Sequence, residues 1–373
     1  MPVIAVDATP LTPYSGAFGG HAIRGIGRYL TSVLTSLAGE QPDWAAAHVL
    51  PVRTADVPLA FWRGDTVVTR RVRLRPQDAG WLSGPVLDRI ALGRRPVDAW
   101  VATDPTAPLA PPRTGFSIVV CYDLIPLLYP NAMATMRRHR RAVYQLYLQR
   151  LRHSDLVIAI SDSVADDLGR WLHLGRDRIA VVYPGLVAAP PDGTADSSDA
   201  PDLLFVGVPA AHKNPGAAVD TLAELVRRGH DVRLRFVGTH PAPARQDLVE
   251  RAAGAGVGDR VDYLDQADDE RLTALYRSSV LLAPSTVEGL GLAPIEALLA
   301  GGRAVCGSAP VFRETLGDAV EYADPAEAGA AANAYEKLAT TPLDVAHHEA
   351  VAARFAPSAS AAATMDALGR FIG

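Results

Sequence analysis

The chain has 373 residues, of which 49% are hydrophobic and 21% charged, with a formal net charge of −5. This composition excludes disordered and fibrous proteins, and a negative chain without a long basic stripe is not typical of nucleic-acid binding. No apolar run approaches the roughly 18 residues of a membrane span, and the N-terminus lacks the basic start of a signal peptide. Cys121 and Cys306 are too few for a disulfide framework. We therefore expect a globular protein of the cytoplasm.

Short runs rich in Val, Ile and Leu alternate with helical patterns along the chain. Most of these runs are apolar throughout, as are strands buried on both faces of a parallel sheet. Strand followed by helix, repeated, is the α/β pattern. The expected strands are Val3–Val6, His48–Pro51, Ala99–Ala102, Ser117–Cys121, Leu156–Ile160, Ile179–Val182, Leu203–Val206, Arg233–Val237, Val261–Leu264, Val280–Ala283 and Ala304–Gly307.

Residues 187–201 are rich in Ala, Pro, Asp, Gly and Ser without periodicity, which is typical of a linker. They separate an N-terminal domain, residues 1–186, from a C-terminal domain, residues 202–354. Charge divides at nearly the same place: residues 1–185 hold 21 basic and 15 acidic residues, against 15 and 26 in residues 186–373. We therefore expect two doubly wound domains, which would place a cleft between the carboxyl ends of their strands.

The segment Pro284–Gly301, PSTVEGLGLAPIEALLAG, carries the most chemical information. It follows an expected strand. Gly289 and Gly291 allow a tight loop, whereas Pro294 suits the first turn of a helix and Gly301 suits its end. Free N–H groups at such a helix start favour an anion such as a diphosphate.

Two glutamates belong to this segment, eight positions apart. Glu288 lies before the loop and Glu296 in the first helical turns. A carboxylate near an anion site can accept hydrogen bonds from sugar or ribose hydroxyls. Taken alone, Glu296 could instead complement the helix dipole, and Glu288 could be a solvated loop residue. The two glycines between them favour the ligand-binding interpretation.

The pattern Glu288-x7-Glu296, in the form EGLGLAPIEALLAGG, resembles the signature of retaining glycosyltransferases of the GT-B fold, family 4. The resemblance extends over nearly the whole chain, and implies two Rossmann-like doubly wound domains facing across a cleft. It also implies a C-terminal helix, about residues 355–373, that packs back on the N-terminal domain. The other similar segments are Arg24–Tyr29, Asp123–Leu127, Ser154–Ser161, Val181–Gly185, Phe205–Gly207, His212–Pro215 and Asp268–Tyr276.

The resemblance also implies roles for individual residues. Lys213 would neutralise the leaving diphosphate, Glu288 would face the donor sugar, and Glu296 would bind the ribose hydroxyls. Lys213 is one of two lysines among 36 basic residues, a departure from the chain's preference for arginine. Tyr122 and Asp123 would lie on the acceptor or sugar side. Further contacts to the nucleotide-sugar would come from Gly25, Gly27, Gly207, His212, Gly289, Leu290, Gly291 and Leu292.

Three positions depart from the family pattern. Tyr122 stands where many relatives carry a His that reaches the donor sugar. His212 stands where an Arg often precedes the motif lysine, and Asp265 replaces a common Gly near the nucleobase edge. The sugar of the donor and its carrier (UDP, GDP or dTDP) therefore stay open.

The implied reaction is the retaining transfer of a hexosyl group from a nucleotide diphosphate sugar to a hydroxyl of a polysaccharide, lipid-linked glycan or natural product. It needs no cofactor and no metal, and the sequence has no Asp-x-Asp motif. One alternative is a sugar-nucleotide epimerase of the same architecture, which would carry catalytic His and carboxylate residues in the cleft. Another is a non-catalytic sugar-nucleotide binding protein, which would be expected to lose Lys213 or a motif glutamate.

The basic cluster Arg137–Arg141 lies in a helical pattern of the N-terminal half, the half that would bind the acceptor. Such a cluster can contact an anionic acceptor or, weakly, the surface of a membrane. It can also be a solvated helix face, which is the interpretation that we prefer.

Overall fold

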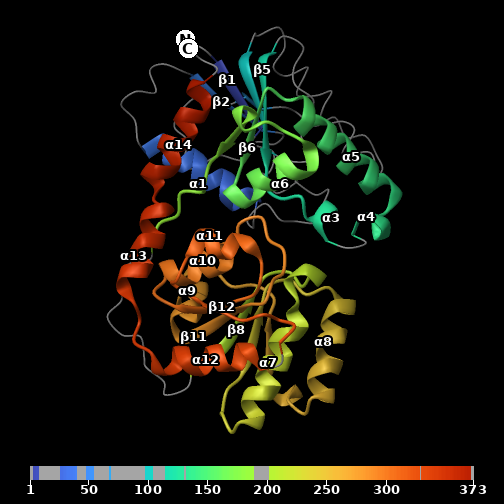
Figure 1. Ribbon diagram of the computed structural model, residues 1–373, viewed down its shortest axis with the longest axis vertical. Coiled ribbons are helices and arrows are strands. Elements are labelled where there is room, and N and C mark those ends of the chain that lie inside the picture. Colours follow the sequence, from blue (N-terminus) through green and yellow to red (C-terminus); the bar gives the residue numbers. More distant parts are fainter. Residues whose placement is uncertain are drawn as a thin grey trace. The chain divides into compact units, whose positions relative to one another are not determined.

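The computed structural model describes residues 3–7, 26–39, 48–53, 67–68, 97–103, 114–129, 132–188, 201–327 and 329–370. The chain divides into two compact units, which Figure 1 shows in ribbon form. Unit 1 is Met1–Leu186 together with Phe355–Gly373, and unit 2 is Val187–Arg354. Most of the predicted linker, residues 187–201, lies outside the described residues.

Unit 1 is built on a seven-stranded sheet with the order β3-β2-β1-β4-β5-β6-β7, and all its pairings are parallel. The chain starts in the middle of the sheet, winds to one edge and then to the other, which is the doubly wound pattern. Its strands are β1 (Val3–Asp7), β2 (His48–Arg53), β3 (Val67–Val68), β4 (Val97–Ala102), β5 (Thr114–Cys121), β6 (Leu156–Ala159) and β7 (Ile179–Val181). Its helices are α1 (Ile26–Gly39), α3 (Ile125–Leu128), α4 (Ala132–Thr135), α5 (Arg138–His153), α6 (Asp162–Leu172), the 3-10 turn η3 (Arg176–Arg178) and α14 (Pro357–Gly369).

The C-terminal helix α14 belongs to unit 1, where it packs on α1 (Figure 1). The residue at which the chain leaves this unit lies next to the residue at which it returns. The Leu186 N–H donates a hydrogen bond to the Phe355 carbonyl at 2.7 Å. The Phe355 ring meets the ring of Tyr183 edge-on, with 5.5 Å between their centroids. Residues more than 160 positions apart in the sequence therefore pack together in the core of unit 1.

Unit 2 contains a second parallel sheet, of six strands, with the order β10-β9-β8-β11-β12-β13. The winding direction reverses between β8 and β11. Its strands are β8 (Asp202–Val206), β9 (Leu234–Val237), β10 (Val261–Leu264), β11 (Ser279–Ala283), β12 (Arg303–Cys306) and β13 (Glu321–Tyr322). Its helical elements are η4 (Ala211–Lys213), α7 (Pro215–Arg227), α8 (Ala242–Gly254), η5 (Gly258–Arg260), α9 (Asp269–Ser278), α10 (Leu292–Leu299), α11 (Pro310–Leu316), α12 (Ala330–Thr340) and α13 (Val345–Arg354).

Alternate residues of the central strands of unit 2 form a buried core with α7 and α12. Phe205 on β8 and Phe236 on β9 are almost completely buried, with 5.2 Å between their ring centroids. Leu222 of α7 and Tyr335 of α12 belong to the same cluster. The residues between them, such as Leu204 and Leu281, are also buried on the opposite face of the sheet. Burial of both faces explains why the strands read as continuous hydrophobic runs in the sequence.

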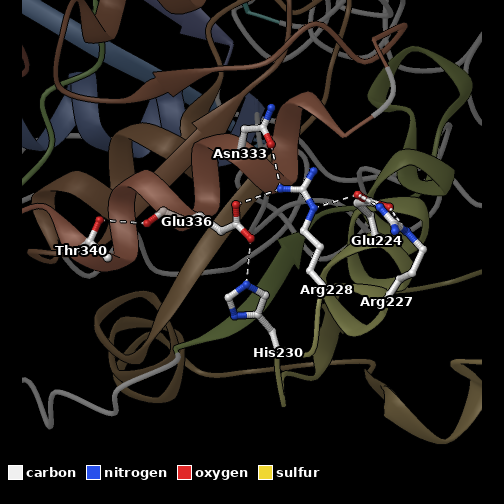
Figure 2. Close-up of polar contacts among 7 residues, drawn as sticks. All are labelled: Glu224, Arg227, Arg228, His230, Asn333, Glu336 and Thr340. Carbon is white, nitrogen blue, oxygen red and sulfur yellow. Dashed lines mark hydrogen bonds and ion pairs between the residues drawn. The ribbon is translucent and has the colours of Figure 1, made fainter.

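A polar network joins α7 to α12 beside this core (Figure 2). The guanidinium of Arg228 donates hydrogen bonds to Glu224 of α7 and to Glu336 and Asn333 of α12, at 2.7 to 2.8 Å. His230 Nε2 lies 2.9 Å from the other oxygen of Glu336. Hydrogen bonds from the neighbouring arginines lower the pKa of the Glu224 carboxyl to about 2. The network holds the end of α7 against α12.

The structure confirms the two Rossmann-like α/β domains with parallel sheets that the sequence predicts. Each expected strand is present within two residues of its predicted bounds, except that β5 begins three residues earlier. The sequence missed β3 and β13, each of which has two residues at the edge of its sheet. Such short strands leave no detectable pattern. Among the described helices, none combines the length and apolar character that a bilayer crossing requires.

Candidate functional site

The predicted donor-site residues of unit 2 gather where the order of its sheet reverses. β8 and β11 are parallel neighbours in the sheet, so their carboxyl ends open at the same edge. Residues 207–214 follow β8 and residues 284–291 follow β11. The Thr286 N–H donates a hydrogen bond to the His212 carbonyl at 3.0 Å, which ties the two loops together.

Lys213 and Glu288 form an ion pair between these loops, although they lie 75 positions apart. Lys213 Nζ is 2.6 Å from Glu288 Oε1, and the side chains are 29% and 13% exposed. The backbone of the next residue, Asn214, turns into the left-handed region at φ 48° and starts α7. The structure thus brings together the cation predicted to meet the diphosphate and the carboxylate predicted to face the sugar.

Ser285 adds a second hydrogen bond to the same carboxylate. Its hydroxyl donates to Glu288 Oε1 at 3.0 Å, and the residue is buried. Its own carbonyl accepts a hydrogen bond from the Ala309 N–H at 3.1 Å. Ser285 was not among the residues predicted from the sequence. The signal that could have found it is a polar residue placed just after the buried strand β11.

Glu296 lies on α10 and is held by the neighbouring helix α9. The Tyr276 hydroxyl donates a hydrogen bond to Glu296 Oε2 at 3.1 Å, and Tyr276 is buried. Tyr276 lies in a segment that resembles the family, but sequence reasoning assigned no contact to it. It positions the carboxylate that we expect to meet a ribose.

Both ends of α10 are formed as the glycines predict. Gly291, at φ 79°, precedes the first turn, and a Cβ built on it would lie 2.5 Å from the ring of Phe312. Gly301, at φ 83°, follows the last turn and bonds to the Leu298 carbonyl, while the next N–H bonds to the Ala297 carbonyl. This pair of bonds is a Schellman motif.

His212 and Gly207 belong to the loop that carries Lys213. Burial lowers the pKa of His212 below its usual 6.5, and the nearby Glu288 opposes this shift. His212 is therefore neutral at pH 7, and Lys213 carries the positive charge of this loop. Gly207 lies beside the stem of Lys213, where a Cβ would be 3.9 Å from its Cδ. Leu290 is buried and Leu292 begins α10.

The remaining predicted site residues belong to unit 1. Gly25 lies outside the described residues, and Gly27 is buried in the first turn of α1. Tyr122 is buried against Tyr29, edge to face, with 5.4 Å between the ring centroids. Asp123 Oδ1 accepts a hydrogen bond from the Ile125 N–H at 3.0 Å, at the start of α3. Their roles stay predictions.

The basic cluster Arg137–Arg141 lies at the start of α5. Arg137, Arg138 and Arg140 are exposed, and the Arg141 guanidinium donates a hydrogen bond to the Ala134 carbonyl at 2.9 Å. Exposure fits both interpretations of this cluster. Within the described part of the chain, no group of three or more His, Cys, Asp or Glu side chains could hold a metal ion.

Comparison with known proteins finds similarity in the part of the chain that holds these residues. Residues 192–354 match the family described as "Glycosyl transferases group 1". The matched segment lies within unit 2. The D-inositol 3-phosphate glycosyltransferase of Nocardia farcinica is 34% identical over 168 residues, which are 41% of this chain and 37% of that protein. The chain spans about a third to two thirds of the length of curated relatives of this kind.

Solved structures of glycosyltransferases share the fold over both units. A sucrose-phosphate synthase from Thermosynechococcus elongatus superposes with a TM-score of 0.72 at 18% identity, covering 99% of this chain and 98% of the other. HepE from Anabaena, in complex with UDP and glucose, gives a TM-score of 0.64 at 16% identity, covering 100% and 95%. At these identities the likeness shows a GT-B fold and no more. The segment that matches the group 1 glycosyltransferase family contains Lys213, Glu288 and Glu296.

Proposed function

We propose that this protein is a retaining glycosyltransferase of family 4, which transfers a hexosyl group from a nucleotide diphosphate sugar to an acceptor hydroxyl without a metal ion. The observation that carries the proposal is the Lys213–Glu288 ion pair at the reversal point of the unit 2 sheet. A group 1 glycosyltransferase segment surrounds this pair. The UDP and glucose bound to HepE, which shares the fold, support a nucleotide-sugar donor.

Departure of the diphosphate is the step for which the site offers the clearest chemistry. Negative charge grows on the leaving oxygen as the glycosidic bond breaks, so a fixed cation stabilises the transition state more than the ground state. Lys213 would supply that cation, and the N–H groups at the start of α10, after Gly291, would favour negative charge near the helix start. In the proposed retaining reaction a donor phosphate oxygen takes the acceptor proton, so we assign no general base.

The two glutamates would orient the donor. Glu296, positioned by Tyr276, would accept hydrogen bonds from the ribose hydroxyls. Glu288 would face the sugar, where its carboxylate accepts hydroxyl protons. Unit 1 would bind the acceptor. Gly25 and Gly27 would contact the nucleotide-sugar, and Tyr122 and Asp123 would lie on the acceptor or sugar side. We further infer a cytoplasmic location, and weak membrane contact through Arg137–Arg141 stays the alternative to a solvated helix face.

A panel of UDP-, GDP- and dTDP-linked sugars, read by thermal shift, tests the donor assignment. A ligand at 100 times its Kd should stabilise the protein by about 2.7 kcal/mol. Release of the nucleoside diphosphate in the presence of candidate acceptors then tests transfer, and excess chelator should leave turnover within about twofold. Conversion of the donor to an epimer without an acceptor would contradict the proposal in favour of an isomerase. Failure of every donor to stabilise the protein would contradict nucleotide-sugar binding itself.

A further inference from the structure

The Glu288 carboxylate has two donors on one oxygen. Lys213 Nζ lies 2.6 Å from Glu288 Oε1, and Ser285 Oγ lies 3.0 Å from the same atom. In the described part of the chain, these two contacts are the side-chain hydrogen bonds of this carboxylate. The Glu288 side chain is only 13% exposed, so water has limited access to replace a lost donor.

A bound diphosphate would compete with Glu288 for the ammonium of Lys213. When Nζ turns toward phosphate oxygens, Glu288 loses its charged partner. A mostly buried carboxylate without a donor is costly, and this cost opposes ligand binding by a factor of about ten or more. A second hydrogen-bond donor that stays on Glu288 Oε1 while Lys213 moves would remove much of this cost.

Ser285 is placed to be that donor, because its position does not depend on the glycine loop. It lies two residues after the end of β11, is 4% exposed, and its carbonyl accepts a hydrogen bond from the Ala309 N–H. The backbone of Gly307, at the end of β12, packs so closely that a Cβ there would lie 2.6 Å from the Ser285 carbonyl oxygen. The backbone of Ser285 is therefore held next to β12, and its buried hydroxyl stays near Glu288.

We propose that Ser285 is a positioning residue of the donor site, which retains the Glu288 carboxylate when a diphosphate takes Lys213. The proposal rests on the proposed function. It explains why the Ser285 hydroxyl and the Lys213 ammonium both donate to Glu288 Oε1. When Lys213 moves to the diphosphate, the carboxylate still has one hydrogen-bond donor. Ser285 acts through Glu288 and Lys213 and need not touch the ligand.

Calorimetric titration with UDP, GDP and dTDP tests this without requiring turnover. For the nucleotide that wild type binds, Ser285→Ala should weaken affinity about tenfold or more, because Lys213 becomes the sole donor to Glu288. Ser285→Thr, which keeps the hydroxyl, should stay within about threefold of wild type. In a Glu288→Ala background, Ser285→Ala should change affinity by less than about twofold, since the carboxylate through which it acts is gone.

Thr286→Ala is the matched control, because it removes a neighbouring hydroxyl whose bond goes to the His212 carbonyl. Its effect should add to that of Glu288→Ala. Melting temperatures exclude unfolding, and Ser285→Cys replaces Ser285→Ala if that variant melts too low. Affinity of Ser285→Ala equal to wild type would overturn this proposal alone, as would a tenfold loss that persists without Glu288. Wild type that binds none of the three nucleotides would overturn the proposed function as well.

Discussion

Replacement of Gly291 by alanine should destabilise unit 2 through two separate effects. Gly291 has φ 79°, a conformation that costs a residue with a Cβ roughly 1–2 kcal/mol. The new Cβ would also lie 2.5 Å from Phe312 Cε1 and 2.9 Å from its Cδ1. Phe312 is 1% exposed, so its ring has no free space into which it can move. Overpacking of this kind typically costs about 1–3 kcal/mol.

Gly301 offers a control at the other end of the same helix. It has φ 83°, and a Cβ built there meets nothing within 4 Å. Gly301→Ala should therefore carry the backbone cost of roughly 1–2 kcal/mol without the steric cost. The difference between the two variants, about 1–3 kcal/mol, isolates the contact with Phe312.

Urea denaturation followed by circular dichroism measures both free energies of unfolding. Gly291→Ala should lose about 2–5 kcal/mol, the sum of the two effects, and a second change, Phe312→Leu, should recover part of that loss by opening space at the ring edge. Equal destabilisation by Gly291→Ala and Gly301→Ala would refute the steric argument. It would mean that the loop before α10 can move away from Phe312 at little cost.

Four other predictions concern the donor site and the packing of unit 2. Glu296→Ala should weaken calorimetric nucleoside diphosphate affinity about tenfold or more, and unchanged affinity would remove this residue from the site. Lys213→Ala should lower turnover roughly a hundredfold at an unchanged melting temperature, with partial recovery in Lys213→Arg; near-equal rates would refute its role. Arg228→Ala, which breaks the contacts to α12, should lower the melting temperature more than Arg227→Ala, whose partner lies on its own helix; the reverse order would contradict the bridging role. Burial lowers the pKa of His348 below 6.5. The unfolded state therefore binds a proton at this residue more readily than the folded state. The free energy of unfolding should fall as pH drops below 6.5. His348→Gln should flatten that decline in denaturation measured at pH 7.5 and 5.5, and an unchanged slope would exclude this residue as its source.

The strands and the ends of α10 could be predicted because their signals are local. A parallel strand between two helix layers must be apolar at every position, and a helix that ends in the left-handed region favours glycine. The donor-site candidates followed from a motif whose members lie close together in the sequence. The candidates outside this motif came from the family resemblance, and the rarity of lysine in the chain supported one of them, Lys213.

The contacts between those candidates could not be predicted, because they depend on the order of strands. Lys213 meets Glu288 because β8 and β11 are neighbours in the sheet, and no pattern within either loop specifies that neighbour. The same holds for Ser285 above Gly307, which requires β11 beside β12. Tyr276 reaches Glu296 from the preceding helix, so its partner also depends on packing between elements.

Unit 1 is made of two separate segments of the chain, and this affects the order in which the units can fold during synthesis on the ribosome. Helix α1 buries Tyr29 and Leu34, yet its partner α14 begins only at Pro357. At about 5–20 residues per second, synthesis of the residues from Leu186 to Pro357 takes on the order of ten to thirty seconds. During that interval the surface of α1 that α14 will cover is bare, whereas the residues of unit 2 emerge as one uninterrupted stretch. Unit 2 can therefore fold completely before unit 1 does, although synthesis of unit 1 starts earlier, because unit 1 still needs α14.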